Sequence, residues 1–275
     1  MAVSSSAGDL AGHVAIVTGA NHGIGEATAR LLAARGAGVL VAYLRAPLAG
    51  TAENPDAYAL QRASDGSAVV DAIRASGARA LAFEADLADP AVIPRLFDAA
   101  EAELGPVDVL VNNASAWCGD TFGPAKAGRI GRSVARLSAA SASQVLDVDA
   151  RAAALMIAEF AGRLIERGGG WGRIVGLTSG GALGFPEEVS YGAAKAAQEN
   201  YTMSAAAELA GHGVTANVVY PPVTDTGWIT DEVRQFVVTS TEHTHVASPG
   251  EVAEVIAWLC TEAARLVSGT ILRLR

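Results

Sequence analysis

The stretch His13-Val-Ala-Ile-Val-Thr-Gly-Ala-Asn-His-Gly-Ile-Gly25 decides the fold of this 275-residue chain. It begins with a short apolar run, 14–17, in which three of four residues are β-branched, as is typical of a strand buried on both faces. Three glycines follow, and residues 26–35 then place helix formers and apolar residues at three- and four-residue spacing. A strand, a glycine turn and a helix in this order present free backbone N–H groups to a phosphate. Glycine is needed there because a Cβ would block the phosphate or forbid the backbone angles.

The alternation of apolar strands and amphipathic helices continues along the chain. We expect further strands over 36–43, 80–83, 107–111 and 173–177, and helices over 67–76, 91–104 and 144–165. Alternating β and α elements predict an α/β fold with a parallel, doubly wound sheet. Since no linker separates two cores, residues 1–275 are predicted to form a single domain of three layers, α/β/α. Within it, 1–12 are expected to be a flexible N-terminus and 223–247 a substrate lid.

Composition and charge exclude several classes of protein. The net charge of −9 argues against a nucleic-acid binder, which usually carries basic patches. The first nine residues lack the basic start and apolar core of a signal peptide, and no apolar run approaches the ~20 residues of a membrane span. We therefore expect a cytoplasmic protein with neither nucleic-acid nor membrane partners. The two cysteines have no metal-type spacing, and His243 and His245 lack further ligands, so no metal site is predicted.

The glycine spacing, Gly19-x3-Gly23-x-Gly25, differs from the commoner G-x-G-x-x-G. Written out as Thr-Gly-x3-Gly-Ile-Gly, it resembles the cofactor fingerprint of the short-chain dehydrogenase/reductase family, and in particular members that reduce 3-oxoacyl-acyl-carrier-protein. Further motifs follow in the family's order over roughly residues 13 to 270: Asp86-Leu87, Asn112-Asn-Ala-Ser115, Tyr191-x3-Lys195 and Asn217-x3-Pro-Pro222. The resemblance implies a Rossmann-type fold and hydride transfer between a nicotinamide and a carbonyl or alcohol carbon.

Tyr191 and Lys195 carry the most specific catalytic signal. Residues four apart on a helix project from nearly the same face, so the hydroxyl and the ammonium can converge. A neighbouring cation favours the phenolate, which would lower the tyrosine pKa toward useful acid/base work. Ser179 ends a strand 12 residues before Tyr191, at the edge where parallel sheets place their sites. This matches the family's catalytic serine, tyrosine and lysine, with Thr178 as an alternative source of the hydroxyl.

The chain departs from the family pattern at several positions. Asp149 stands where the family commonly has a catalytic asparagine, and we expect it to pair with Lys195 and to alter the pH dependence. Ser115 and Pro222 each replace a glycine. The last residues, up to Arg275, lack the usual Gly-Gly tail. The resemblance implies a homo-oligomer, a dimer or a tetramer, and this tail helps to pack the family's tetramers.

The resemblance also implies a cofactor, and the residues favour NADP over NAD. The acid that binds the adenosine ribose in NAD-preferring folds is replaced by Tyr43, Arg45 lies two residues on, and His22 fills a turn position where NADP-dependent relatives often carry Arg. The structural alternatives are Arg45 as a solvated loop charge and Asp86 as a helix cap, although Asp89, directly before Pro90, is the better candidate for that cap. The cofactor-binding positions implied are Gly19, Asn21, His22, Gly23, Ile24, Gly25, Tyr43, Arg45, Asp86, Leu87, Asn113, Ala114, Ser115, Tyr191, Lys195, Pro221, Thr224 and Thr226.

The substrate is the least determined part. We interpret 47–66 as an insertion over the adenine side, and expect the substrate to be lined by Trp117, Phe185, Trp228 and Ile229. Residues Arg129, Arg132 and Arg136 would align along one helix face, either as a solvated face or as a carboxylate or phosphate clamp. The predicted function is an NADP-dependent 3-oxoacyl or ketone reductase. The main alternative is a non-catalytic NAD(P)-binding sensor on the same fold.

Overall fold

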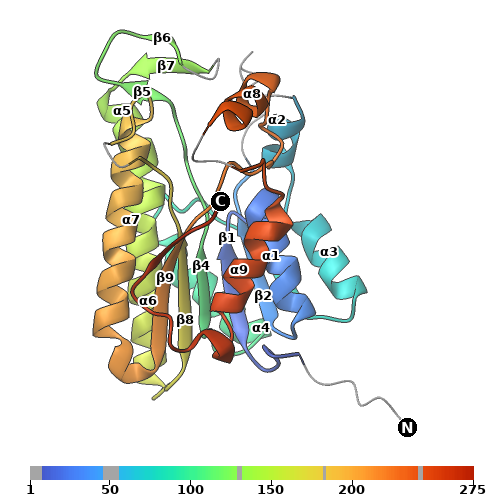
Figure 1. Cartoon of the computed structure of the whole chain (residues 1–275). Helices are drawn as coiled ribbons and strands as arrows, with labels where there is room; N and C mark the ends of the chain where they lie inside the picture. The colour runs from blue at the N-terminus through green and yellow to red at the C-terminus, as the bar shows by residue number, and fades with distance from the viewer. Residues whose placement is uncertain (1–7, 46–55, 129–131, 182–183, 241–243) are drawn as a thin grey trace.

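The computed structural model describes residues 8–45, 56–128, 132–181, 184–240 and 244–275, without the side chains of 56, 57, 126 and 127. Its centre is a parallel sheet of seven strands in the order β10-β9-β8-β4-β1-β2-β3 (Figure 1). The order reverses between β1 and β4, which makes this the switch point of a doubly wound sheet. The strands are β1 (Val14–Thr18), β2 (Gly38–Tyr43), β3 (Ala80–Glu84), β4 (Val109–Asn112), β8 (Gly172–Leu177), β9 (Val214–Tyr220) and β10 (Ile271–Arg273).

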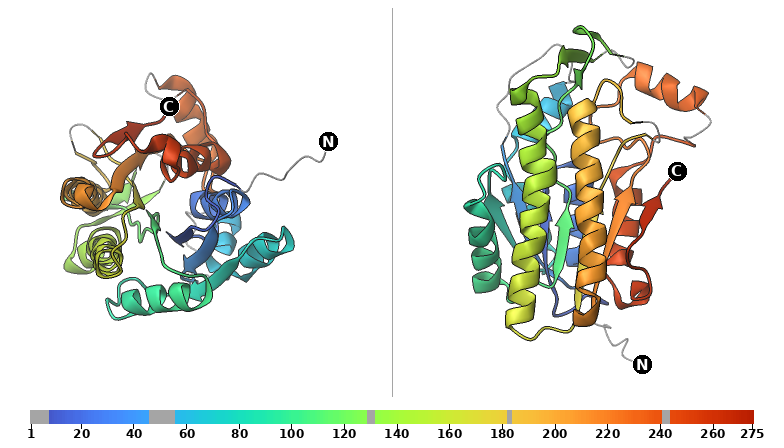
Figure 2. Two further views of the ribbon diagram at one scale, coloured as in Figure 1. Left: turned by 90° about the horizontal axis from the view of Figure 1, so that it is seen from below. Right: turned by 90° about the vertical axis from the view of Figure 1, so that its left-hand side faces the viewer.

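Helices cover both faces of the sheet and give three layers (Figure 2). Successive residues of a strand point to opposite faces. In β1, Ala15 and Val17 join one apolar cluster with α1 (Gly23–Ala34), α3 (Ser67–Ala75) and α9 (Pro249–Leu259). Val14 and Ile16 join a second cluster with α4 (Val92–Glu103), α6 (Ala153–Glu166) and α7 (Val189–Glu208). The central strands are buried on both faces, as their unbroken apolar runs predicted, and the α/β/α fold class is confirmed.

Smaller elements gather beyond the carboxyl ends of the strands, at the top of Figure 1. They are a second sheet in the order β5-β7-β6, with α2 and α8 beside it. Their bounds are β5 (Asp120–Thr121), β6 (Lys126–Ala127), β7 (Ser133–Arg136), α2 (Asp56–Ala63) and α8 (Asp231–Thr239). The helix face expected for Arg129, Arg132 and Arg136 is wrong. Residues 133–136 form a strand whose backbone pairs with β5 and β6, and Arg129 lies outside the described residues.

Two other expectations need correction. Leu10 is fully buried in the core and its N–H donates to the Arg35 carbonyl at 3.0 Å, so the flexible N-terminus expected over 1–12 does not reach this residue. The single helix expected over 144–165 is α5 (Ala139–Val145), a π-helical segment (Leu146–Ala152) and α6 in succession. Two short 3-10 turns, Ala210–His212 and Glu262–Ala264, complete the elements. Among the described residues, no helix is both long enough and apolar enough to cross a membrane.

Candidate active site

The turn between β1 and α1 has room for glycine alone at its key positions. Gly19 and Gly23 have φ angles of 64° and 57°, which other residues rarely adopt. A Cβ on Gly25 would lie 2.2 Å from the Gly19 carbonyl oxygen, and one on Gly23 would lie 2.9 Å from Cγ2 of Thr226. This cradle, which a Cβ would fill, opens onto the N-terminus of α1 and fits the pyrophosphate of a dinucleotide. Thr226 lies against the turn, although it follows Gly23 by 203 residues in sequence.

Asn113 holds this turn in place. Its Nδ2 donates to the carbonyl oxygens of Thr18, at 2.8 Å, and Gly19, at 3.0 Å. The N–H groups of Asn113 and Ala114 in turn donate to the Thr18 hydroxyl, both at 3.0 Å. Asn113 and Ala114, the first two residues of the predicted Asn-Ala-Ser group, therefore fix the start of the glycine turn through hydrogen bonds to Thr18 and Gly19. Thr18, which the sequence analysis did not select, is the acceptor that joins them.

The adenosine end of the predicted cofactor site carries Tyr43 and Arg45. Tyr43 is buried at the end of β2, beneath Gly66. Arg45 forms a two-point ion pair with Glu84 at the end of β3, with Nε at 2.9 Å and Nη2 at 2.7 Å from the carboxylate oxygens. Arg45 is therefore neither a free solvated charge nor an isolated phosphate ligand. Its Nη1 is the part of the fork that Glu84 does not engage in these bonds.

His22 is uncharged in this structure, unlike the arginine that many NADP-dependent relatives carry at its position. Burial, with the positive charge of Arg62 as a second cause, lowers the pKa of His22 to about 4, so its imidazole is neutral at pH 7. It cannot supply the positive charge that an arginine would. Its neighbour Asn21 donates to the Ser64 carbonyl at 2.8 Å, which ties the turn to the end of the 47–66 segment. Residues 47–55 of that expected insertion lie outside the described residues.

Asp86 and Leu87 follow β3 at the same edge of the sheet. Asp86 is exposed and its Oδ1 accepts the Ala88 N–H at 2.9 Å, while Leu87 packs into the core. Asp89 likewise accepts from Ala91, two residues on, at 3.0 Å. Neither aspartate caps α4, whose N-cap is Ala91 with no side-chain bond. The expectation that Asp89 would cap this helix is therefore wrong, because its carboxylate closes a local turn instead.

The segment after β9 supplies the other predicted cofactor residues. Pro221 is half-buried and Thr224 is buried, with its hydroxyl donating to the Pro222 carbonyl at 2.8 Å. Ile24, the remaining predicted residue of the glycine turn, is half-buried and packs on the core. This segment then passes the turn at Thr226 and continues to α8.

Lys195 lies deep beneath the catalytic edge, on the inner face of α7. Its Nζ donates to the Leu177 carbonyl and to Gln198 Oε1, both at 3.0 Å, and lies 3.1 Å from Asp149 Oδ1. Both charged side chains are almost inaccessible to solvent. The expected pairing of Asp149 with Lys195 is present in the structure. Lys195 Nζ also lies 5.6 Å from the centre of the Tyr191 ring, so the two predicted side chains do converge.

Asp149 sits in the π-helical segment, where one turn of the helix is wider than usual. Its second oxygen accepts the Ala116 N–H at 2.8 Å, so the carboxylate joins the loop after β4 to the lysine of α7. π-bulges inside helices are frequent at functional sites. Here the wider turn accompanies a buried carboxylate that contacts both the Lys195 ammonium and the Ala116 N–H.

The pKa of Tyr191 moves in the opposite direction to the one expected. Burial raises it well above its ordinary value, and the negative charges of Asp149 and Glu188 raise it further. A hydrogen bond with the Ser115 hydroxyl acts in the lowering direction. The lysine does not reverse the effect of burial, because Asp149 compensates its charge. Tyr191 is therefore held in its protonated form.

The sequence left two candidates at the end of β8 for the hydroxyl that would bind the substrate, Ser179 and Thr178. Thr178 is buried and its Oγ1 donates to Glu199 Oε1 at 2.6 Å. Ser179 follows it at the exit of the strand and is half-buried. Because the threonine hydroxyl is committed to Glu199, Ser179 is the better source of a hydroxyl for a ligand.

Aromatic side chains border the predicted catalytic tyrosine, Tyr191. The Phe185 ring lies 6.1 Å from the Tyr191 ring, centre to centre. Arg132 places its guanidinium carbon over two indoles, 4.6 Å from the centre of Trp117 and 4.4 Å from that of Trp228. The structure thus brings together residues expected to line the substrate with an arginine from the wrongly predicted helix. Ile229 follows Trp228 and is half-buried.

Sequence reasoning missed two further residues of this site. Gln198 binds Lys195 and also donates to the Asn112 carbonyl at 3.1 Å, linking α7 to the end of β4. Its position three residues after Lys195, on the same helix face, could have predicted this contact from the sequence. Asp120 is fully buried and accepts the Ser190 N–H at 2.8 Å, next to Tyr191. No local pattern distinguishes this aspartate from other loop acids.

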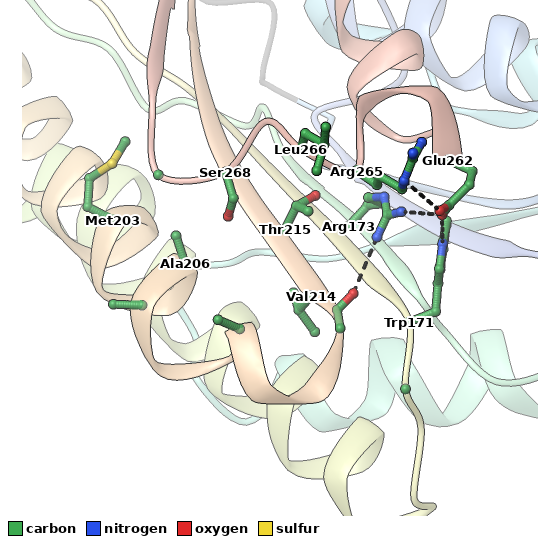
Figure 3. Close-up of a pocket in the computed structure, with 15 residues that line it drawn as sticks. Trp171, Arg173, Met203, Ala206, Val214, Thr215, Glu262, Arg265, Leu266 and Ser268 are labelled. Atoms are coloured by element: carbon green, nitrogen blue, oxygen red, sulfur yellow. Dashed lines mark hydrogen bonds and ion pairs between the residues drawn. The ribbon is translucent and has the colours of Figure 1, made fainter.

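A hollow of about 670 Å³ lies elsewhere in the molecule and is not part of this site. Figure 3 shows its lining, with Arg173 and Arg265 directed at Glu262, and Met203 and Ser268 on the opposite side. It lies at the amino ends of β8 and β9, whereas the predicted residues lie at the carboxyl ends of the strands. Parallel sheets bind their ligands at the carboxyl ends.

Comparison with known proteins agrees with this geometry. Residues 19–274 match the family model described as enoyl-(acyl carrier protein) reductase. The cis-4-hydroxycyclohexanecarboxylate dehydrogenase of Sinomonas cyclohexanicum is 37% identical over 96% of this chain and 95% of its own length. The NADPH-dependent aldehyde reductase-like protein of Arabidopsis thaliana chloroplasts is 32% identical, over 96% and 93%. A crystal structure of a 3-oxoacyl (acyl-carrier-protein) reductase from Agrobacterium tumefaciens C58 with NADP bound is 28% identical, with a TM-score of 0.78 and coverage of 100% and 96%.

The glycine turn generates a direct prediction. Gly25→Ala should weaken NADPH binding by at least about tenfold, because its Cβ would displace the Gly19 carbonyl and with it the turn. Gly162→Ala is the matched control. The added Cβ would lie within α6 and meet no atom within 4 Å, and alanine has a higher helix propensity than glycine. Fluorescence titration of NADPH measures both. Equal affinity of Gly25→Ala and Gly162→Ala would contradict the assignment of the turn.

Proposed function

The chain belongs to the short-chain dehydrogenase/reductase family, and from that premise we propose that it is an NADP-dependent enzyme that interconverts a cyclic ketone and its secondary alcohol. One observation carries the proposal. Lys195 is buried beside the partly buried Tyr191 at the carboxyl edge of the sheet, and the β4 loop joins this pair to the glycine turn. A binding-only protein would have no need to bury a lysine beside a tyrosine there.

The proposed mechanism divides the work among four side chains. A bound nicotinamide supplies or accepts the hydride. Ser179 donates a hydrogen bond to the carbonyl oxygen of the substrate, and Tyr191 gives that oxygen a proton during reduction. Lys195 holds the nicotinamide ribose, and Asp149 fixes the position of Lys195. A tyrosine with a raised pKa keeps its proton at neutral pH, which suits the reducing direction.

Two candidate substrate classes remain in competition. The Sinomonas relative is named for an alcohol on a cyclohexane ring, and Trp117, Trp228 and Phe185 offer apolar surfaces for such a ring. The Agrobacterium structure is of a 3-oxoacyl (acyl-carrier-protein) reductase, which supports a linear 3-oxoacyl substrate. We infer the cyclic ketone, because of the higher identity and the aromatic surroundings.

Turnover of NADPH with a ketone tests the function. The wild-type protein should oxidise NADPH with 4-oxocyclohexanecarboxylate faster than with acetoacetyl-CoA, as followed by absorbance. Tyr191→Phe should reduce kcat by at least about 100-fold, because it removes the transferable proton and little else. Tyr201→Phe, at an exposed position of the same helix, should leave kcat unchanged.

Three results would contradict the proposal. Faster reduction of acetoacetyl-CoA would favour the 3-oxoacyl class. NADPH binding without turnover of either ketone would favour the sensor. An unaltered kcat in Tyr191→Phe would remove Tyr191 from the proton transfer.

The pH dependence tests the Tyr191 environment. Alcohol oxidation requires deprotonated Tyr191, so a raised pKa delays oxidation to higher pH. Asp149→Asn removes a charge that raises this pKa and leaves Lys195 uncompensated, so the acid limb of log(kcat/KM) should move to lower pH by about one unit.

Ser115→Ala is the opposite test. It removes a hydrogen bond that lowers the pKa of Tyr191, so it should move the acid limb to higher pH. Asp147→Asn, which pairs with Arg151 in the same π segment, is the control and should leave it unmoved. Shifts of the same sign in Asp149→Asn and Ser115→Ala would refute this account.

Cofactor preference tests Arg45 and its partner together. Arg45→Ala should weaken NADPH binding by about tenfold and leave NADH binding unchanged, because only the 2′-phosphate requires a cation. Glu84→Gln should strengthen NADPH binding, because it removes a carboxylate that occupies two of the guanidinium N–H groups. Titrations of both nucleotides against the wild type and each variant measure these changes. A loss of NADPH affinity in Glu84→Gln would show that the ion pair itself, and not Arg45 alone, builds the site.

A further inference from the structure

Arg132 is a candidate ligand group that the catalytic mechanism does not use. Its guanidinium lies over the indoles of Trp117 and Trp228 and is half-buried. An indole ring accepts no conventional hydrogen bond, so this contact leaves the in-plane N–H donors of the guanidinium available. Within the described part of the chain, the Arg132 side chain forms neither a hydrogen bond nor an ion pair.

The two tryptophans connect Arg132 to the two halves of the active site. Trp117 follows Ser115 and Ala116, which contact Tyr191 and Asp149 respectively. Trp228 lies two residues after Thr226, which touches the glycine turn. The guanidinium therefore stands where the catalytic side and the cofactor side of the site meet.

The position of Arg132 is also fixed relative to the catalytic helix. It directly precedes β7, which pairs with β5 at Asp120, opposite Ala135. Asp120 accepts the N–H of Ser190, the residue before Tyr191, and a hydrogen bond from the Ser141 hydroxyl at 2.9 Å. This buried carboxylate joins the small sheet to α7, so Arg132 and Tyr191 are held on connected elements.

Electrostatic neighbours support the same placement. The negative charge of Glu188 raises the pKa of both the Arg132 guanidinium and the Tyr191 hydroxyl. Burial lowers the pKa of Arg132, and Glu188 acts against this lowering. A half-buried guanidinium is costly unless an anion meets it, and carboxylates match its planar fork with two parallel hydrogen bonds.

We propose that Arg132, held against Trp117 and Trp228, binds a carboxylate carried by the substrate, at the end of the molecule remote from the reacting carbon. This rests on the proposed function and narrows its substrate class to anionic cyclic ketones and alcohols. The tryptophans shield the ion pair from water and contact the ring, while Arg132 fixes which end of the substrate enters toward Tyr191.

Ligand binding tests this site without requiring turnover. Isothermal titration of the NADP-saturated protein should show cyclohexanecarboxylate binding at least about tenfold more tightly than the uncharged cyclohexanecarboxamide. Arg132→Gln should remove that preference, and Arg132→Lys, which keeps the charge but loses the fork, should retain part of it. Arg136→Gln is the matched control, because Arg136 is an exposed arginine at the far end of β7, the strand that Arg132 directly precedes, and it should keep the full preference.

The outcomes separate this proposal from the function on which it rests. No preference in the wild type, or a preference that survives in Arg132→Gln, would overturn the anion site even if ketones are reduced. A loss of NADPH affinity but not NADH affinity in Arg132→Gln would assign the guanidinium to the cofactor phosphate, and would also overturn it. A carboxylate preference that depends on Arg132, without turnover of any ketone, would support the site and refute the proposed function.

Discussion

The hydrogen bonds of Asn113 to Thr18 and Gly19 hold the point at which the sheet changes direction. They join the ends of β1 and β4, the two neighbouring strands between which the chain order reverses. A crevice forms at such a point because the connections on either side lead away from each other. Residues 114–116 continue directly from this anchor to Tyr191 and Asp149. The glycine turn and the predicted catalytic cluster are therefore both anchored at Asn113, and a shift of Asn113 would move both.

The buried Lys195–Asp149 pair sets the chemical character of the cluster. Removing two charges from water is costly, and their attraction repays this only if the remaining donors and acceptors are satisfied. Leu177, Gln198 and Ala116 provide those partners. The compensation has a consequence for Tyr191: a neutralised lysine gives little stabilisation to a phenolate, so burial dominates and the phenol stays protonated. Asp149, the carboxylate that stands where the family has an asparagine, thus helps to keep Tyr191 in the protonated form that can donate a proton.

Much of the fold was predictable from the sequence, because the central strands are continuous apolar runs and the glycine turn needs residues without a Cβ. The positions of Tyr191 and Lys195 followed from helical spacing in the same way. The direction of the Tyr191 pKa did not, because it depends on burial and on Asp149, which is 42 residues away in sequence. The neutrality of His22 depends likewise on burial and on Arg62. The stretch around Arg132 was assigned to a helix because charge spacing was weighed without the strand partners β5 and β6, which lie outside any local window.

The residues proposed for proton transfer and the residue proposed for substrate recognition lie on different parts of the fold. In our proposal, the proton-transfer cluster is built from strands and helices of the main α/β/α layers, whereas Arg132 lies directly before β7 of the small sheet beyond the carboxyl edge. Asp120 is the connection between them, since its carboxylate holds both the start of α7 and the start of α5 while its backbone pairs with β7. A substitution at Arg132, directly before β7, can remove the proposed ligand-binding group and leave Tyr191 in place as long as this carboxylate keeps its partners. If both proposals hold, substrate preference can change at Arg132 while the residues around Tyr191 that carry the proposed reaction stay unchanged.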